Sequence, residues 1–270
     1  MDPDPPPVPR GGPVGPLWVR ARTACSRVAT AALVTGSVLV LSPHPDDETI
    51  ACGLLLAATA ARGDRVSVAL ATDGGLGWFG DGPAPPPDEV AAVRSAEWHL
   101  ALDILGVERG ARHELALPDG DLGAHEAAAA AAVSRILADE APSRVFLPSP
   151  DDLHADHRAL ARAALRAVAS GAAADRVPAL FTYRVYPEAG LWPAGADLGT
   201  SPLGAAWRLA RSLPLVVRDR DLALHAPEQA SRKARALAAY VSQCRLLGGS
   251  AGGVWGRGVE LFRPIDVRPP

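Results

Sequence analysis

The stretch SVLVLSPHPDDETIACGLLLAATAARGDRVSVALAT, residues 37–72, contains the pattern that decides the fold. Residues 37–42 are a compact β-branched apolar run that stops at Pro43, which is typical of a strand buried on both faces. Residues 48–63 have the composition of a helix closed by a glycine, and a second apolar run follows at 65–72. A strand, a helix and a strand in this order predict a parallel crossover.

The same alternation continues along the chain. After a Gly- and Pro-rich loop, the periodicity predicts helices at 88–106, 124–138, 154–169 and 228–247, and strands near 113–118, 143–150, 179–186, 213–219 and 259–265. Strands that alternate with helices favour crossovers between parallel neighbours. We therefore expect an α/β fold with a Rossmann-like, mostly parallel open sheet flanked by helices.

The composition is that of a folded protein with a substantial core. Of 270 residues, 48% are hydrophobic and 21% charged, which suits one large domain. We predict a loosely ordered tail over residues 1–30, rich in Pro and Gly, and a single domain over 31–270. A net charge of -3 gives no general attraction for nucleic acid or for an anionic membrane.

Cysteine usage and hydropathy predict a cytoplasmic location. The three cysteines are widely separated and match no zinc-finger or disulfide pattern, which favours a reducing compartment. No apolar run approaches the ~18–20 residues of a membrane span. The N-terminus also lacks the basic start and apolar core of a signal peptide. Nothing in the sequence predicts an oligomeric state.

Two clusters of polar side chains follow two of the predicted strands. The clusters are His44, Asp46, Asp47 and Glu48 after the first strand, and Asp151, Asp152, His154, Asp156 and His157 after the strand at 143–150. In open α/β sheets, ligands lie beyond the carboxyl ends of the strands, so the two clusters can meet at one point. Imidazoles and carboxylates without thiolates suit Zn²⁺, or another divalent first-row metal, in a site with an open position.

A purely structural explanation exists for each cluster. Asp46 or Asp47 can cap the following helix, and His154 and His157 can be a solvated pair at the start of theirs. Taken singly, these explanations are as plausible as a metal site. Together they are weaker, because clustered carboxylates repel one another unless something neutralises them.

Several motifs resemble those of the PIG-L / LmbE-like zinc-dependent N-deacetylases. The pair PHPDDE at 43–48 and HADH at 154–157 is similar to the two signature motifs of that family. VRSAEWHLALDILGV resembles its Arg-x-x-Glu helix, LALPDGDL its Leu-Pro-Asp-Gly turn, and KARALAAYVSQ its C-terminal helix. The matched segments run from about residue 37 to 265. The resemblance implies the LmbE-like variant of the Rossmann-like sheet.

The resemblance also implies a set of metal ligands and a base. His44, Asp47 and His157 would hold a zinc ion, and Asp46 would remain free as the general base. The chemistry agrees, because two imidazoles and one carboxylate leave positions for water and for a substrate carbonyl. If the side chains of Asp46 and Asp47 diverge, Asp46 can face the water instead of the ion.

Four further residues have candidate roles, two of them with a structural alternative. His154 is the candidate that stabilises the oxyanion, and Asp156 is expected to orient a neighbouring imidazole. Arg94 corresponds to the family position that contacts a polar substrate, although an ion pair with Glu97 or Asp88 is an alternative. Glu48 is equally well explained as an ordinary residue of the first helical turn.

These motifs predict an enzyme that removes an acetyl group from the nitrogen of an amino-sugar conjugate of the N-acetylglucosamine type. The expected partner is that small molecule, not nucleic acid or a membrane span. A metallo-phosphoesterase that holds two ions is an alternative, as is a hydrolase of another amide or a binding protein without catalysis. The loop TDGGLG at 72–77 lacks the usual Glu of the family, which leaves the substrate less well predicted than the reaction.

Overall fold

The computed structural model describes residues 26–171, 177–185, 221–243 and 258–265. Its strands are β1 (Arg27–Val28), β2 (Val38–Ser42), β3 (Val66–Thr72), β4 (Arg112–Leu117), β5 (Arg144–Pro148), β6 (Ala179–Tyr183), β7 (Leu222–His225) and β8 (Val259–Ile265). Its α-helices are α2 (Thr30–Val34), α3 (Asp47–Ala61), α4 (Pro87–Leu105), α5 (Glu126–Glu140), α6 (Ala155–Ala169) and α8 (Ala230–Ala238). Short 3-10 turns are η1 (Arg109–Ala111), η2 (Pro227–Gln229) and η3 (Val241–Gln243).

The strands form one open sheet in the order β1-β7-β8-β6-β5-β2-β3-β4. All pairs are parallel except those that β8 makes with β6 and β7. The expected mostly parallel α/β sheet is therefore confirmed. Every residue of β2 and β3 is buried, which is why both strands are mostly apolar along their length instead of alternating with charged residues.

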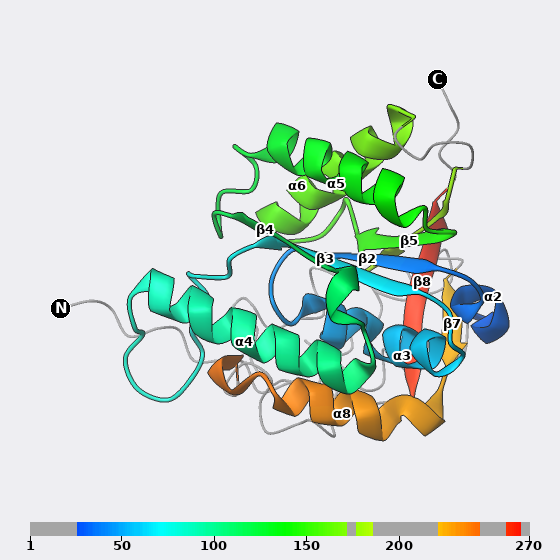
Figure 1. Ribbon diagram of the computed structural model, residues 1–270, viewed down its shortest axis with the longest axis horizontal. Helices are drawn as coiled ribbons and strands as arrows, with labels where there is room; N and C mark the ends of the chain where they lie inside the picture. The colour runs from blue at the N-terminus through cyan, green and yellow to red at the C-terminus, as the bar shows by residue number, and fades with distance from the viewer. Residues whose placement is uncertain (1–25, 172–176, 186–220, 244–257, 266–270) are drawn as a thin grey trace, which may run out of the picture.

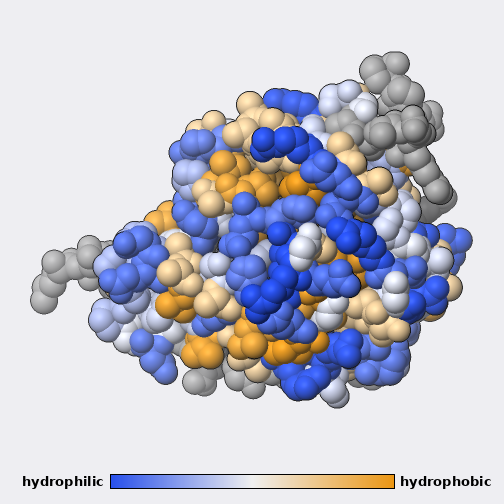
Figure 2. Space-filling model, viewed as in Figure 1, coloured by the Kyte–Doolittle hydropathy of each residue, from blue (hydrophilic) through white to orange (hydrophobic). Residues whose placement is uncertain are grey.

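Helices cover both faces of the sheet, so the core has two halves. Helices α3, α4 and α8 pack on one face, while α5 and α6 pack on the other (Figure 1). One half of the core joins Leu54 and Leu55 of α3 to Trp98 of α4, and the other joins Val133 of α5 to Leu160 of α6. The outer surface in the view of Figure 2 is a mixture of hydrophilic and hydrophobic residues. No helix of the described residues is long and apolar enough to cross a membrane.

The position of β2 decides where a ligand can bind. β2 pairs with β3 on one side and with β5 on the other, so the connections that leave β2 and β5 run in opposite directions across the sheet. Such a switch in strand order opens a crevice at the carboxyl edge. Both polar clusters of the sequence follow these two strands, so the topology brings them to one crevice.

Some elements differ from the sequence-based prediction. β1, α2 and β7 carry too few residues to show a periodic pattern, and β1 lies inside the segment 1–30 that was assigned to the tail. The predicted helix at 228–247 ends at Ala238, and a 3-10 turn follows because the backbone N–H of Ser242 binds Glu97 instead of continuing the helix. The predicted strand at 213–219 lies outside the described residues.

A buried ion pair joins the C-terminal elements to the middle of α3. The Lys233 Nζ atom lies 2.7 Å from Glu260 and donates to the backbone oxygen of Ile50, also at 2.7 Å. The Glu260 carboxylate accepts from the backbone N–H groups of Leu54 and Leu55 at 2.8 and 3.0 Å. The Lys233 stem runs where a side chain at position 53 would start, since a Cβ on that glycine would lie 2.9 Å from it.

Replacing Lys233 by methionine is expected to lower the free energy of unfolding by about 3–5 kcal/mol, because the Glu260 charge would stay buried without its partner. Urea denaturation followed by circular dichroism measures this change. Arg62→Met is the matched control, since the exposed pair of Arg62 with Asp64 should contribute less than about 1 kcal/mol. Equal effects of the two substitutions would contradict the prediction.

Candidate metal centre and active site

The two clusters predicted from the sequence meet at the carboxyl ends of β2 and β5. His44, Asp46 and Asp47 belong to the turn that leads from β2 into α3, while His154 and His157 belong to the start of α6. Their rings lie close together, since the His44 centroid is 4.7 Å from that of His154 and 5.3 Å from that of His157. The three imidazoles could each offer one nitrogen to a common ion.

Asp47 stands between the two histidines that the resemblance assigns to the metal. Its Oδ2 atom lies 3.1 Å from His44 Nδ1 and 3.2 Å from His157 Nε2. The same oxygen accepts from the backbone N–H of His44, which fixes the turn. One carboxylate oxygen thus touches both imidazoles, and the predicted set His44, Asp47 and His157 is brought together.

The other nitrogen of His44 faces two more carboxylates. His44 Nε2 lies 3.2 Å from Asp156 Oδ2 and 3.3 Å from Asp119 Oδ1. Asp156 is itself held by the backbone N–H groups of Gly120 and Leu122, at 2.8 and 3.1 Å. A carboxylate with this support can fix the orientation of the His44 ring, which is the role expected of Asp156.

Asp152 supports the second motif in the same way. Its Oδ2 atom lies 3.3 Å from His157 Nδ1, and its Oδ1 atom accepts from the backbone N–H of His154. His154 begins helix α6, where its Nδ1 accepts from the backbone N–H of Asp156. The His154 ring is more exposed than those of His44 and His157, so it is the imidazole that a substrate can reach.

Asp46 points away from the imidazoles. Its Oδ2 atom lies 3.4 Å from Arg94 Nη2, whereas its neighbour Asp47 faces both histidines. The backbone at Asp46 has φ 135° and ψ -30°, a conformation that residues with a side chain rarely adopt. This turn of the backbone makes the two successive carboxylates diverge, as the proposed division between base and ligand requires.

Arg94 occupies a different environment from the one expected. The side chain is only 3% exposed, and its Nη atoms donate to the backbone oxygens of Gly74 and Pro45 at 2.9 and 2.8 Å. A Cβ on Gly77 would overlap the guanidinium, so the Gly-rich loop wraps around it. A direct contact with substrate stays a prediction, while the geometry places Arg94 between this loop and Asp46.

Electrostatics at the cluster indicate an excess of negative charge. Burial alone would lower the pKa of His44, but the carboxylates of Asp119, Asp156 and Asp47 raise it well above its usual value. Burial is likewise outweighed at His157, where Asp47 and Asp152 raise the pKa to about 9. In the other direction, His157 and His44 hold the pKa of Asp47 well below its usual range despite burial.

The pKa of Asp46 moves in the opposite sense. Burial and the charges of Asp47 and Glu48 raise it to about 8, although Arg94 acts against that rise. The pKa of His154 is lowered by burial and by the neighbouring imidazoles of His44 and His157. The cluster therefore contains adjacent groups with widely separated proton affinities, which is a feature of catalytic sites.

The donor set fits a divalent metal. Zinc bonds of ~2.0 Å at tetrahedral angles place ligand atoms ~3.3 Å apart, close to the 3.1 and 3.2 Å that separate Asp47 Oδ2 from the two histidine nitrogens. A cation would also take the place of the protons that the raised pKa values assign to His44 and His157. Carboxylates on the outer imidazole nitrogens complete the usual surroundings of such a site.

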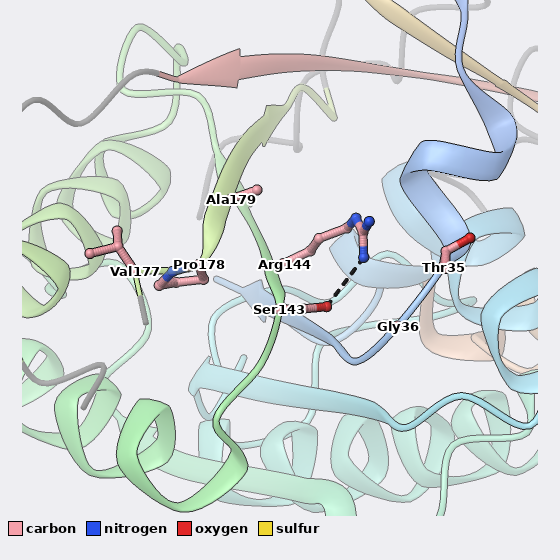
Figure 3. Close-up of a pocket in the computed structure, with 7 residues that line it drawn as sticks. All are labelled: Thr35, Gly36, Ser143, Arg144, Val177, Pro178 and Ala179. Atoms are coloured by element: carbon pink, nitrogen blue, oxygen red, sulfur yellow. Dashed lines mark hydrogen bonds between the residues drawn. The ribbon is translucent and has the colours of Figure 1, made fainter. Parts of the chain in front are cut away.

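A separate cavity of about 430 Å³ lies at the opposite edge of the sheet (Figure 3). Its lining residues are Thr35, Gly36, Ser143, Arg144, Val177, Pro178 and Ala179. They precede or begin β2, β5 and β6, so the cavity opens at the amino ends of the strands. It contains none of the histidines or carboxylates of the cluster and is not part of the candidate active site.

Comparison with known proteins finds a curated relative that matches part of the chain. A curated deacetylase of 1D-myo-inositol 2-acetamido-2-deoxy-alpha-D-glucopyranoside from Segniliparus rotundus is 44% identical over 91 residues. The match covers 30% of this chain and 28% of that protein.

Solved structures show the same fold at low sequence identity. The N,N'-diacetylchitobiose deacetylase from Pyrococcus horikoshii is 21% identical with a TM-score of 0.60, over 85% of this chain and 83% of that one. GalB, the 4-carboxy-2-hydroxymuconate hydratase from Pseudomonas putida KT2440, is 17% identical with a TM-score of 0.60, over 87% and 98% of the two chains. The fold thus serves more than one reaction, and the site must decide the function.

The fold and the site together define an α/β protein of the LmbE-like class, with a His- and Asp-rich cluster at its sheet switch point. Residues 39–168 match the PIG-L family, described as GlcNAc-PI de-N-acetylase. The chain therefore carries a PIG-L family domain over these residues. The matched range includes both motifs, from His44 to His157, and the turn that carries Asp119.

Two supporting carboxylates had no assigned role in the sequence analysis. Asp152 has a signal in the sequence, because it stands two residues before His154 in an acidic run. Asp119 is the first aspartate of the LALPDGDL motif, where it reads as a turn residue before glycine, and the structure adds its contact with His44.

Proposed function

We propose that this protein is a metal-dependent deacetylase that hydrolyses the N-acetyl group of an amino-sugar conjugate of the N-acetylglucosamine type. The observation that carries the proposal is the convergence of His44, Asp47 and His157 from two loops, with Asp46 directed elsewhere. The membership of residues 39–168 in the PIG-L family gives the reaction class. Zinc is the proposed metal, and another divalent first-row ion would suit the same donors.

Asp46 is the proposed general base and acid. When bound, a divalent ion would supply a water molecule of lowered pKa and would polarise the amide carbonyl. Asp46 would take a proton from the water and later deliver it to the departing amine nitrogen. A bound ion would offset the charges of Asp47 and Glu48, which add to burial in raising the pKa of Asp46, and would therefore favour the ionised carboxylate that a base requires.

The remaining polar residues would orient the proposed ligands and base and stabilise the charge that develops on the substrate. His154 lies at the more accessible side of the cluster, where it can donate a hydrogen bond to the oxygen that gains charge at the amide carbon. Asp156 and Asp152 would hold the rings of His44 and His157 through their outer nitrogens. Arg94 would keep the Asp46 carboxylate and the Gly-rich loop in place, and contact with the substrate is the role expected from the resemblance.

The substrate class rests on the relatives. Two of the similar proteins named above, the deacetylases, act on an acetylated glucosamine linked to inositol and on diacetylchitobiose, and both substrates carry an N-acetylglucosamine unit. We propose a small molecule of this class as the partner, acted on by a single domain over residues 31–270. The buried thiol of Cys52 is compatible with the proposed cytoplasmic location.

Release of acetate tests the proposal. We expect the zinc-loaded protein to release acetate from at least one of N-acetylglucosamine, diacetylchitobiose and N-acetylglucosaminyl-inositol, and to leave a free amine in equal amount. Asp46→Asn protein, loaded with metal in the same way, is the matched control. The assignment would be overturned if the native protein released no more acetate than the Asp46→Asn protein from any of these substrates. It would also be overturned if the native protein cleaved phosphate monoesters instead.

A further inference from the structure

The backbone at Asp46 needs support from its surroundings. A φ of 135° at a residue with a side chain is strained, and such residues persist only where neighbouring groups hold them. Besides the bond between Asp47 and the backbone N–H of His44, two contacts act on the backbone beside this residue: Arg94 donates to the oxygen of Pro45, and the Glu48 carboxylate faces the backbone N–H of Asp46. The second contact comes from a residue without a role in the proposed chemistry.

Glu48 is a fully buried carboxylate surrounded by donors. Its Oε2 atom accepts from the backbone N–H of Asp46 at 3.4 Å and from Ser42 Oγ at 3.1 Å. Its Oε1 atom accepts from Tyr240 Oη at 2.6 Å and from Thr49 Oγ1 at 2.5 Å. The side chain folds back over the first turn of α3, as the acidic residue of a capping box does.

Tyr240 fixes which way the Glu48 carboxylate faces. The tyrosine is 1% exposed and follows α8, which is packed against α3 and α4. Because its hydroxyl binds Oε1, the other oxygen of Glu48 is left toward Ser42 and the backbone of Asp46. A hydrogen bond from the C-terminal part of the chain therefore reaches the turn that carries the proposed base.

We propose that Glu48 and Tyr240 are positioning residues that hold the backbone of Asp46 in its left-handed conformation and so keep the Asp46 and Asp47 side chains apart. Without this support the turn would relax toward ordinary φ values, and the Asp46 carboxylate would leave its place beside Arg94. The inference rests on the proposed function only where activity is measured, because the conformation of Asp46 can be tested without a substrate.

The first test uses stability alone. Glycine adopts a positive φ without support, so Asp46→Gly removes the need for the Glu48 contact. We expect Glu48→Gln to lower the Tm of the native protein by at least about 2–4 °C more than it lowers the Tm of a protein that already carries Asp46→Gly. Equal shifts in the two backgrounds would mean that Glu48 does not act through the Asp46 backbone, and the inference would fail.

The second test uses the release of acetate. We expect Glu48→Gln and Tyr240→Phe each to lower kcat by about 10- to 100-fold, with KM and zinc content nearly unchanged. The reason is that the Asp46 carboxylate would move slightly away from the water molecule that it deprotonates. Either substitution should cause no further loss in a protein that carries Asp46→Asn. If the loss in kcat from either substitution instead multiplies the loss from Asp46→Asn, Glu48 and Tyr240 have a general packing role and the proposal is overturned. If Glu48→Gln does not fold, Tyr240→Phe, which removes one hydroxyl, decides the question.

Glu260→Gln is the matched control for both tests. Glu260 is also a buried glutamate that binds backbone N–H groups of α3, but it does so at Leu54 and Leu55, away from the turn. Its effects on Tm and kcat should be independent of the residue at position 46. Full activity of Asp46→Asn would refute the proposed base and leave the stability test to decide the positioning role.

Discussion

Replacing His157 by alanine is expected to abolish stoichiometric metal binding and to reduce acetate release by at least about 10³-fold. An ion that contributes several kcal/mol of transition-state stabilisation accounts for a loss of this size. His157 is fully buried between Asp47 and Asp152, so water cannot easily replace it as a donor in the same place. Elemental analysis of the purified protein, with one divalent ion expected per native chain, measures the first effect.

His125→Ala is the control for this substitution, since the exposed His125 ring lies 3.9 Å from Asp121 and outside the cluster. Its metal content should equal that of the native protein. A native content of two ions per chain would point to a second ion at His44, Asp119 and Asp156 and would favour the phosphoesterase alternative. Unchanged metal in His157→Ala protein would remove this histidine from the ligand set.

Replacing Asp46 by asparagine is expected to have the second largest effect, a loss of activity of at least about 10²-fold with the metal retained. The asparagine amide has nearly the same shape but cannot accept the water proton. The metal should stay because the Asp46 carboxylate faces Arg94, whereas Asp47 faces His44 and His157. Initial rates of acetate release, together with elemental analysis, separate the two effects.

The substitution Asp47→Asn at the adjacent position is the matched control. Unlike Asp46→Asn, it is expected to lower the metal content. It replaces an oxygen that touches both imidazoles, so the protein should lose metal as well as activity. If both asparagine variants lose metal, Asp46 is a ligand and not a free base. Full activity of Asp46→Asn would instead leave Asp46 with a structural role beside Arg94 alone.

Elements far from the site in sequence contact the segments that carry it. Helix α3 starts at the His and Asp cluster, and its middle is bonded to α8 and β8 through Lys233 and Glu260. The Gly-rich loop is fixed by Arg94 at Gly74 and by Gln243 at Gly77. The chain therefore positions its polar residues with buried hydrogen bonds from several segments, which is how an active site keeps a fixed geometry.

The sequence alone predicts the order of the longer strands and helices and the two motifs that form the cluster. These predictions succeed because residues 37–72 carry strong local signals: two mostly apolar strands, a helix closed by glycine, and acidic residues at the end of the first strand. The rule that ligands bind at the carboxyl edge of the sheet then predicts, from the sequence alone, that His44 and His157 lie close together. Short elements such as β1 and β7 gave no comparable signal.

Only the tertiary structure decided which side chains support those ligands. Glu48 and Tyr240 are separated by 192 residues, and Asp119 reaches His44 from a turn that reads as an ordinary one. Arg94 is buried because the backbone oxygens of Gly74 and Pro45 surround it, although its helix position resembles an exposed substrate contact. Local periodicity specifies the face on which a residue lies, whereas the partner across the core depends on packing between distant segments, which no local pattern records.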